Sequence, residues 1–533
     1  MEVDTVTSYD LLTLIAFCLS SFFVIVPTRI PLSFLQSKRG EVVDFTLDFS
    51  WSPLFGVIIL LTSNCITIDD IWRGIIGDET LQPYSILILF LSLSYISISI
   101  DATGLFSFIA NYFTKRIGGS GKTFYFFIFF LSSILTIFTS NDIVIMTLTP
   151  IISHIANQSK INPIAFLIIQ FFSANIWSAA LYIGNPTNVI VAQSVHMNFF
   201  EYSLWNFLPT FFAGITMFML TTFFTFSKIP IVIPGDIATA AKLDRFSAAL
   251  STFLMVLSLI SIIVFTFLPQ YPIFIATLPF AIIVFLKDVL HDLFFNEYNR
   301  KRKTGNEQSP ESPKNAENPE ENVNPESTKN EAEEEQQERP EIQERAENIV
   351  VAPVDDTENL PISRFHWRTK QILEKMPWKI IPFVLGMFIL VEALNIAGWI
   401  SVFARFFGSV VGDNIFVAAL FVGVTSALAC NVMNNQPMTI LFVQIILNSN
   451  YSSNPTIISV SLFAVALGSN FGANLTLIGA LAGILWSEIL SYNNQKVSYF
   501  LFAFYGFRIM PLVIFIALLT LALEFFIFYS RTL

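Results

Sequence analysis

The chain has 533 residues, of which 54% are hydrophobic and only 13% are charged. Soluble proteins carry about 25% charged residues, so the composition excludes an ordinary soluble fold and indicates a protein that contacts lipid. The net charge of −11 is confined to one segment. Residues 304–360 hold 17 acidic and 4 basic residues, so the rest of the chain sums to +2 and offers no case for nucleic-acid binding.

Apolar segments along the chain reach or approach the roughly 20 residues that cross a bilayer core. They predict an all-α polytopic membrane protein with about ten transmembrane helices. The expected crossings are 11–27, 52–68, 85–110, 164–195, 206–227, 246–268, 271–286, 378–397, 456–490 and 499–528.

Two further apolar stretches, 124–152 and 414–447, have polar residues at their centres. Each is too long for one straight crossing, so each is expected to be a re-entrant helical hairpin. Gly, Asn and Pro also interrupt 164–195 and 456–490, which predicts two broken helices.

The acidic segment 304–360 is rich in Glu, Asn, Pro, Ser and Gln and cannot bury enough apolar surface to fold alone. It is expected to be disordered within a cytoplasmic linker, 287–377. The linker separates a first part, 1–286, from a second part, 378–533, and the second repeat of the chain is expected to begin near 246 within the first part.

Loop charges predict the orientation through the positive-inside rule. The N-terminus carries no Lys or Arg, which places it outside or in the lumen, whereas loops near residues 38, 115, 242, 302 and 368 are basic and are expected to face the cytoplasm. The sequence leaves open whether the membrane is the plasma membrane or a vacuolar or vesicular one.

The two parts contain matching motifs. Gly104 precedes Asn141 by 37 residues, and Gly398 precedes Asn435 by 37 residues (141 − 104 and 435 − 398). Further on, the motif beginning at Gly184 is matched with the one beginning at Gly472. Each repeat then holds five crossings and one hairpin, and because five is odd, the second repeat must be inverted in the membrane.

Breaks in membrane helices expose backbone groups that protein, water or a ligand must satisfy. Four breaks in matching places therefore predict a transport site, although single Asn or Thr residues there also suit the capping of broken helices. Asp142 is the candidate proton carrier, because a carboxylate at membrane depth is costly and is usually functional. The expected site residues are Ser140, Asn141, Asp142, Gly184, Asn185, Thr187, Asn188, Asn434, Asn435, Gln436, Gly472, Asn474 and Thr476.

These motifs resemble the arsenical pump membrane permease family within the ion transporter superfamily. The resemblance rests on Ser140-Asn141-Asp142 with Leu148-Thr149-Pro150, Gly184-Asn185-Pro186-Thr187-Asn188, Met433-Asn434-Asn435-Gln436-Pro437 and Gly472-Ala473-Asn474-Leu475-Thr476. It implies efflux of arsenite and antimonite in exchange for protons, by a transport domain that moves against a scaffold, often in a homodimer. Relatives carry silicic acid, sodium, or di- and tricarboxylates.

Two details refine the resemblance. The dicarboxylate branch continues its Ser-Asn signature with Thr, where this chain has Asp142, which favours the arsenical branch. The chain departs from the family at Gln436, where Leu or Ile is more usual, and no acidic residue follows Asn474.

We therefore expect a secondary active transporter, with proton-coupled efflux of arsenite-like or antimonite-like oxyacids. One alternative is a sodium- or proton-coupled transporter of citrate, dicarboxylates or other anions. An alternative of another class is a channel or the membrane subunit of an ATP-driven pump. The expected partners are a small inorganic oxyacid or organic anion, a coupling proton or sodium ion, and the bilayer. No enzyme activity, cofactor or metal is expected, since no catalytic constellation, P-loop or His/Cys cluster occurs.

Overall fold

The computed structural model describes residues 8–26, 28–36, 42–48, 50–77, 82–106, 108–109, 112, 119–232, 243–265, 267–268, 271–306, 368–493 and 495–529. Contacts divide the chain into two units, Met1–Val289 with Arg368–Leu533, and Leu290–Trp367. The candidate site lies wholly in the first unit.

Helices make up nearly all of the described residues, and the chain is a helical multi-pass membrane protein, as its composition predicts. Nine helical stretches within the described ranges are long and apolar enough to cross a membrane. Two of them, Gly121–Phe138 and Ile415–Met433, lie in the segments predicted as hairpins.

One short segment is not helical. Strand β1 (Thr28–Gln36) pairs with β2 (Val42–Leu47) in an antiparallel ribbon, in which Thr28 lies opposite Leu47. The β-branched and aromatic residues of Val42–Leu47 favour a strand. A hydropathy window of about 19 residues averages such a short signal away.

The elements before the predicted linker begin with α1 (Ser8–Ile25), α2 (Ser52–Thr62), α3 (Ile68–Ile76) and α4 (Pro83–Ala102). They continue with α6 (Gly121–Phe138), α7 (Asn141–Ser159), α8 (Ile164–Trp177), α9 (Pro186–Ser194), α10 (Phe199–Thr225), η1 (Phe226–Lys228), α11 (Arg245–Phe265), η2 (Ile273–Ala276) and α12 (Leu278–Asn306).

The elements after it are α13 (Arg368–Lys375), α14 (Ile380–Ile396), α15 (Trp399–Val411), α16 (Ile415–Val417), the π-helix η3 (Ala418–Val422), α17 (Gly423–Met433), α18 (Asn435–Leu447), α19 (Pro455–Gly472), α20 (Leu481–Tyr492) and α21 (Tyr499–Tyr529). Asparagine begins several helices, because its side-chain oxygen accepts a backbone N–H of the first turn. Asn185, Asn198, Asn414 and Asn454 do so for α9, α10, α16 and α19.

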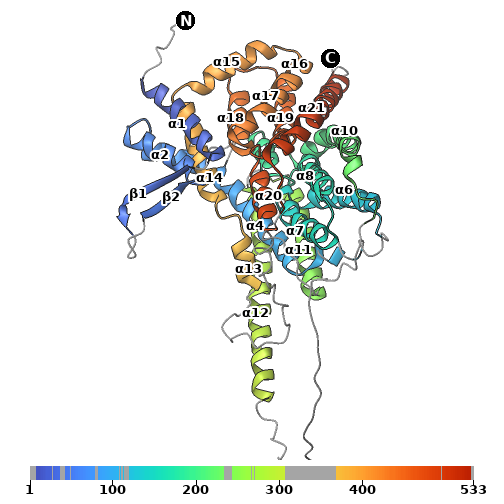
Figure 1. Cartoon of the computed structure of the whole chain (residues 1–533). Helices are drawn as coiled ribbons and strands as arrows, with labels where there is room; N and C mark the ends of the chain where they lie inside the picture. The colour runs from blue at the N-terminus through green and yellow to red at the C-terminus, as the bar shows by residue number, and fades with distance from the viewer. Residues whose placement is uncertain are drawn as a thin grey trace, which may run out of the picture. The chain divides into compact units, whose positions relative to one another are not determined.

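The same order of elements occurs twice (Figure 1). A long helix, α4 or α14, is followed by a glycine in the left-handed region, Gly104 at φ 79° and Gly398 at φ 78°. Then, after α15 in the second half, come two helical segments joined at a short break, a broken helix, and a long final helix, α10 or α21. The broken helices match residue for residue: their breaks, 178–185 and 473–480, begin and end 295 residues apart (473 − 178 and 480 − 185).

Two helices extend into the range 287–377 that is predicted as the linker. Helix α12 continues to Asn306 and α13 begins at Arg368, so both enter the range 287–377. The apolar run stops at 286 because Lys287 and Asp288 follow, yet these two side chains form a buried ion pair 2.8 Å apart. The hydroxyl of Ser99 donates to the Asp288 carboxylate at 2.7 Å, so the pair is stabilised inside the fold. The remainder of the segment predicted to be disordered, 307–360, lies outside the described residues.

Polar contacts near helix ends join segments that are predicted to lie on the same side of the membrane. Three ion pairs link cations at and after α13 to acids of the first part: Arg368 with Asp244 at 3.0 Å, Lys375 with Asp101 at 3.1 Å, and Lys379 with Asp48 at 3.0 Å. Asp101, which precedes the matched Gly104, therefore has a structural partner. Trp399 and Asp10 are both predicted to lie on the other side of the membrane, and the Trp399 indole donates to the Asp10 carbonyl at 2.7 Å.

Candidate functional site

The two short breaks differ in backbone strain. Between α6 and α7, Ser140 is extended at φ −161°, a conformation open to any residue. Between α17 and α18, Asn434 adopts φ 71° and ψ 154°. A side chain in this region costs about 1–3 kcal/mol, and such strain concentrates at functional sites. The residues around the second break must therefore hold the Asn434 backbone in this conformation.

Asn141, at the start of α7, connects three of the breaks. Its backbone N–H donates to the Gly184 carbonyl at 3.3 Å, and its side-chain amide donates to Asn175 on α8 at 2.8 Å. The Asn175 amide in turn donates to Asn474 at 3.0 Å. One hydrogen-bonded chain thus runs from the first short break to the second broken helix, across both parts of the protein.

The first broken helix is closed by its own asparagines. The Asn188 amide donates to the carbonyls of Ser178 and Leu181 at 2.7 and 2.9 Å, two backbone groups that the break frees. Asn470 of α19 accepts from Asn185 at 2.9 Å and donates to Asn188 at 2.8 Å. Asn185 and Asn188 are both buried, so at these two predicted positions the side chains serve the fold of the break.

In the second broken helix, residues at and just before the second short break form hydrogen bonds with the groups that the helix break frees. The Asn431 amide donates to the Gly472 carbonyl at 2.9 Å, and its oxygen accepts from the Thr476 hydroxyl at 2.6 Å. Asn434 donates weakly to the Ile478 carbonyl at 3.4 Å. The structure therefore brings the four breaks together in one polar network.

Four polar atoms in this network stay open: they are buried and have no hydrogen-bond partner within the part of the chain that the structure describes. These open polar atoms are Thr187 Oγ1, Asn434 Oδ1, Gln436 Oε1 and Asn474 Nδ2. Buried polar groups in proteins are nearly always paired, so each calls for a ligand or a water molecule. Two are acceptors, one is a donor, and the threonine hydroxyl can be either.

Asp142 occupies the second position of α7, as Gln436 occupies the second position of α18. Asp142 is 8% exposed, and its carboxyl group makes no hydrogen bond or ion pair within the part of the chain that the structure describes. The first turn of a helix carries partial positive charge, which suits a carboxylate. At this matching position, the first half therefore has a carboxyl group and the second half has a neutral amide.

Four other predicted residues make local contacts. A side chain at Gly184 would collide with the Ser178 carbonyl, and one at Gly472 would collide with Ala427, so both positions require glycine. The Ser140 hydroxyl lies 3.4 Å from the Asn141 side-chain oxygen. Asn435 contributes its backbone carbonyl, which accepts from Thr439 at 2.8 Å.

Sequence reasoning missed Asn175, Asn431 and Asn470 and matched the broken helices in a different register. The structure pairs Asn175 with Asn470, each two residues before its helix ends. A spacing signal for this pair was present. Asn175 follows Asn141 by 34 residues, and Asn470 follows Asn435 by 35 (175 − 141 and 470 − 435). The predicted match of the motif at Gly184 with the motif at Gly472 aligned residues that occupy different positions relative to their breaks.

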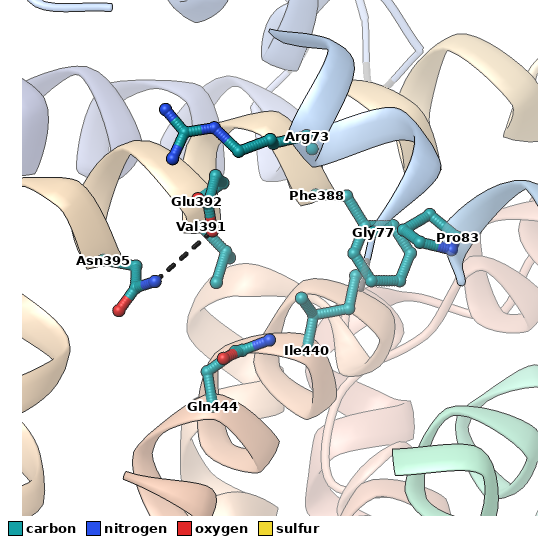
Figure 2. A pocket seen from close by; sticks show the side chains of 10 residues that line it. Arg73, Gly77, Pro83, Phe388, Val391, Glu392, Asn395, Ile440 and Gln444 are labelled. Atoms are coloured by element: carbon teal, nitrogen blue, oxygen red, sulfur yellow. Dashed lines mark hydrogen bonds between the residues drawn. The ribbon is translucent and has the colours of Figure 1, made fainter. Parts of the chain in front are cut away.

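A cavity of about 230 Å³ lies beside the network, between α3, the start of α4, one face of α14 and α18 (Figure 2). Its lining combines apolar Phe388, Val391 and Ile440 with Arg73 and Glu392. Ile440 stands five residues beyond Asn435 on α18, about 7–8 Å along the helix. The cavity therefore lies along α18, and none of the predicted site residues lines it.

Family comparisons match both parts of the chain. The citrate transporter family model matches residues 38–293, and the arsenical pump membrane protein model matches residues 363–528. An arsenical pump membrane protein of Escherichia coli is 22% identical over 488 residues, covering 90% of this chain and 94% of the relative. A putative arsenical pump membrane protein of Bacillus subtilis is 21% identical over 458 residues, covering 84% and 87%.

Among solved structures, the YdaH transporter of Alcanivorax borkumensis covers 98% of this chain and 98% of its own, at 11% identity and a TM-score of 0.47. The family models and the near full-length relatives agree with the membrane helices described above. The chain is a secondary transporter that is similar to the arsenical pump membrane proteins over 90% of its length and to the citrate transporter family over residues 38–293.

Proposed function

We propose that this secondary transporter exports a small neutral oxyacid of the arsenite or antimonite type in exchange for protons. The observation that carries the proposal is the set of open polar atoms, which mixes acceptors and donors at the breaks. No Lys or Arg occurs in any of the four breaks. A neutral polyhydroxyl solute donates and accepts hydrogen bonds at once and needs no countercharge.

Asp142 is the proposed proton carrier. A carboxyl group at membrane depth is far less costly when it holds a proton than when it is charged. Without a cationic partner among the described residues, Asp142 has no fixed charge to compensate it. Release of its proton on one side and uptake on the other would couple the solute to the proton gradient.

We propose that the two repeats are inverted and that α6–α7 and α17–α18 are hairpins entering from opposite sides. Loop contacts support this arrangement. Near the end of α7, Asn157 donates to the Asn493 carbonyl at 3.0 Å, in a loop that precedes basic Lys496. Near the end of α18, Asn448 donates to Ser401 of α15 at 3.2 Å. The orientation proposed from the loop charges, with the N-terminus outside or luminal, is compatible with both contacts.

A second candidate is a sodium- or proton-coupled carrier of citrate or dicarboxylates. The match of the citrate transporter model to residues 38–293 favours it. Helix N-termini at α7, α9 and α18 offer N–H donors to a carboxylate. The lack of a cationic side chain in the breaks weighs against this candidate, because a citrate trianion would rely on helix ends alone.

The test uses purified protein in vesicles with an imposed pH gradient. We expect uphill movement of arsenite, saturable and abolished when the proton gradient is collapsed, and no gradient-driven movement by Asp142→Asn. The control is Asp101→Asn, an acid that pairs with Lys375. It should keep most of the flux.

The outcomes separate the candidates. Movement of citrate without arsenite would remove the oxyacid assignment and leave the second candidate. Arsenite flux that does not saturate and ignores the proton gradient would indicate a channel. Flux that requires ATP and a partner protein would indicate the membrane subunit of a pump.

A further inference from the structure

Helices α8 and α19 each carry one buried asparagine two residues before the break. Asn470 uses its amide fully. The oxygen accepts from the Ser178 hydroxyl at 2.7 Å and from Asn185 at 2.9 Å, and the nitrogen donates to Asn188 at 2.8 Å and to the Ala466 carbonyl at 2.7 Å. Three of its four partners belong to the broken helix of the other half.

Asn175 makes the reciprocal contact. It accepts from Asn141 at 2.8 Å and donates to Asn474, in the broken helix of the second half, at 3.0 Å. Both Asn175 and Asn470 are fully buried. Each half therefore supplies the amide that completes the other half's break, over 282 and 299 residues of sequence.

The contact to Asn474 decides which of its atoms stays open. An asparagine side chain has one acceptor oxygen and one donor nitrogen, and a partner that engages one end fixes where the other end lies. Because Asn175 donates to the Asn474 oxygen, the Asn474 nitrogen is the atom left unpaired. Asn175 thereby sets the polarity of one open polar atom.

Asn470 acts on the first break in a comparable way. It holds Asn185 and Asn188, the residues on either side of Pro186 and Thr187 at the start of α9. The Asn185 oxygen, in turn, accepts the backbone N–H of Thr187 at 3.2 Å. The Thr187 hydroxyl, another open polar atom, is thus carried on a turn that Asn470 fixes from the opposite half.

We infer that Asn175 and Asn470 are positioning residues that brace the two broken helices against each other and orient the polar atoms that receive the solute. The inference deepens the proposed transport function and rests on it for the identity of the solute. The hydrogen bonds of Asn175 and Asn470 to the opposite half, here called the brace, are present in the solute-free protein. They can therefore be tested without measuring transport.

The same two helices provide matched controls. Asn162 accepts the Ile164 N–H at the start of α8, and Asn454 accepts the Thr456 N–H at the start of α19, both at 3.0 Å. Replacing either with Ala removes an asparagine hydrogen bond from the same helix but at the end away from the break. The comparison is Asn470→Ala against Asn454→Ala, and Asn175→Ala against Asn162→Ala.

The first measurement is hydrogen exchange of the full-length, solute-free protein, resolved by peptide. Asn470→Ala should raise exchange at least tenfold across 178–188, in the half that does not contain the substitution. Asn454→Ala should change exchange only near 454–458. Unchanged exchange across 178–188 in Asn470→Ala would overturn the brace, whatever the protein transports.

The second measurement is vesicle flux, expressed per folded protein. Asn470→Ala should raise KM for arsenite about tenfold or more with a change in maximal rate below about threefold, while Asn454→Ala keeps KM within twofold. A fall in maximal rate at constant KM would assign Asn470 to folding alone. If no solute moves in the wild type, the proposed function fails, while the exchange result still decides the brace.

A third variant, Asn470→Asp, separates the roles of oxygen and nitrogen. The carboxylate keeps the acceptor for Ser178 and Asn185 but loses the donors to Asn188 and to the Ala466 carbonyl. At a pH high enough to ionise this buried carboxyl group, the KM of the variant should match that of Asn470→Ala. In acid, the protonated group donates again, so the ratio of its KM to the wild-type KM at the same pH should fall at least threefold. A ratio that stays constant with pH would contradict the donor role.

Discussion

The first and second halves of this transporter have the same order of helices but use their breaks differently. In the first broken helix, Asn185 and Asn188 are engaged by the backbone and by Asn470. In the second half, Asn434, Gln436 and Asn474 each keep an atom open, and Asn434 is held in a strained conformation. The first half contributes the open hydroxyl of Thr187 and the carboxyl group of Asp142.

The difference shows how a duplicated architecture can divide its tasks. An asparagine whose hydrogen bonds are used up stabilises the break and has nothing left for a solute. An asparagine with an unpaired atom costs stability in the empty protein and gains a partner when the solute binds. The comparison therefore separates residues that should affect stability from residues that should affect affinity.

The largest effect is expected for Asn188→Ala. It removes three hydrogen bonds, to Ser178, Leu181 and Asn470. At about 1 kcal/mol for each bond in a membrane protein, the free energy of unfolding should fall by roughly 2–4 kcal/mol. Unfolding of the purified protein in mixed micelles measures it. Full stability combined with weakened solute binding would show that Asn188 serves the solute and not the break.

Gln436→Leu is expected to weaken solute binding and to leave stability unchanged, with a smaller free-energy change than Asn188→Ala. The substitution removes an open acceptor, so stability should stay the same or rise slightly, while KM for arsenite should increase about tenfold, or about 1.4 kcal/mol. Flux at several solute concentrations and an unfolding curve of the same preparation decide it. A loss of stability without a change in KM would contradict the assignment.

Asn434→Gly sharpens the comparison at the backbone. Glycine adopts φ 71° without strain, so the substitution removes about 1–3 kcal/mol of backbone strain from the folded state. The greater freedom of glycine in the unfolded chain costs about 0.5–1 kcal/mol. We expect a net gain of about 1 kcal/mol in unfolding free energy, together with a higher KM because the Asn434 oxygen is lost. The same change at extended Ser140 should not stabilise the protein, and equal gains at both positions would argue against strain at Asn434.

The smallest effect concerns a contact outside the breaks. Partial burial raises the pKa of Asp244, but hydrogen bonds from Ser247 and Arg368 outweigh it and hold the pKa below its ordinary value. A carboxyl group with a lowered pKa stabilises the fold above its unfolded pKa of about 3.9, and this is lost as pH falls through the folded pKa. Arg368→Gln should therefore cost about 0.2–1 kcal/mol near pH 7 and less at pH 3. A cost that is the same at both pH values would contradict the pairing.

The sequence predicts the parts of this protein that depend on long apolar runs and on breaks within them. The centres of both short breaks, near Asn141 and Asn435, agree with the helix ends. The ribbon at Thr28–Leu47 was missed because its signal is shorter than a membrane crossing. The end of α12 was misplaced because Lys287 and Asp288 read as a polar boundary, whereas they neutralise each other inside the fold.

Within the site, residue type and spacing identified the breaks but not the hydrogen bonds that each asparagine makes. Asn185 and Asn474 occupy different positions in their breaks: Asn185 has both ends of its amide engaged, whereas Asn474 keeps its nitrogen open. That distinction depends on Asn175 and Asn470, which lie in apolar helices and contact the opposite half. Contacts between residues almost 300 positions apart leave no trace in local composition.

The exchange of asparagines between halves has a consequence for biosynthesis. Asn188 reaches the membrane 282 residues before its partner Asn470 has been made. At 5–20 residues per second, the first break waits for roughly 15–60 s with its amides incompletely paired. During translation, the nascent first half is therefore the vulnerable species, and completion of α19 is the step that closes both broken helices together.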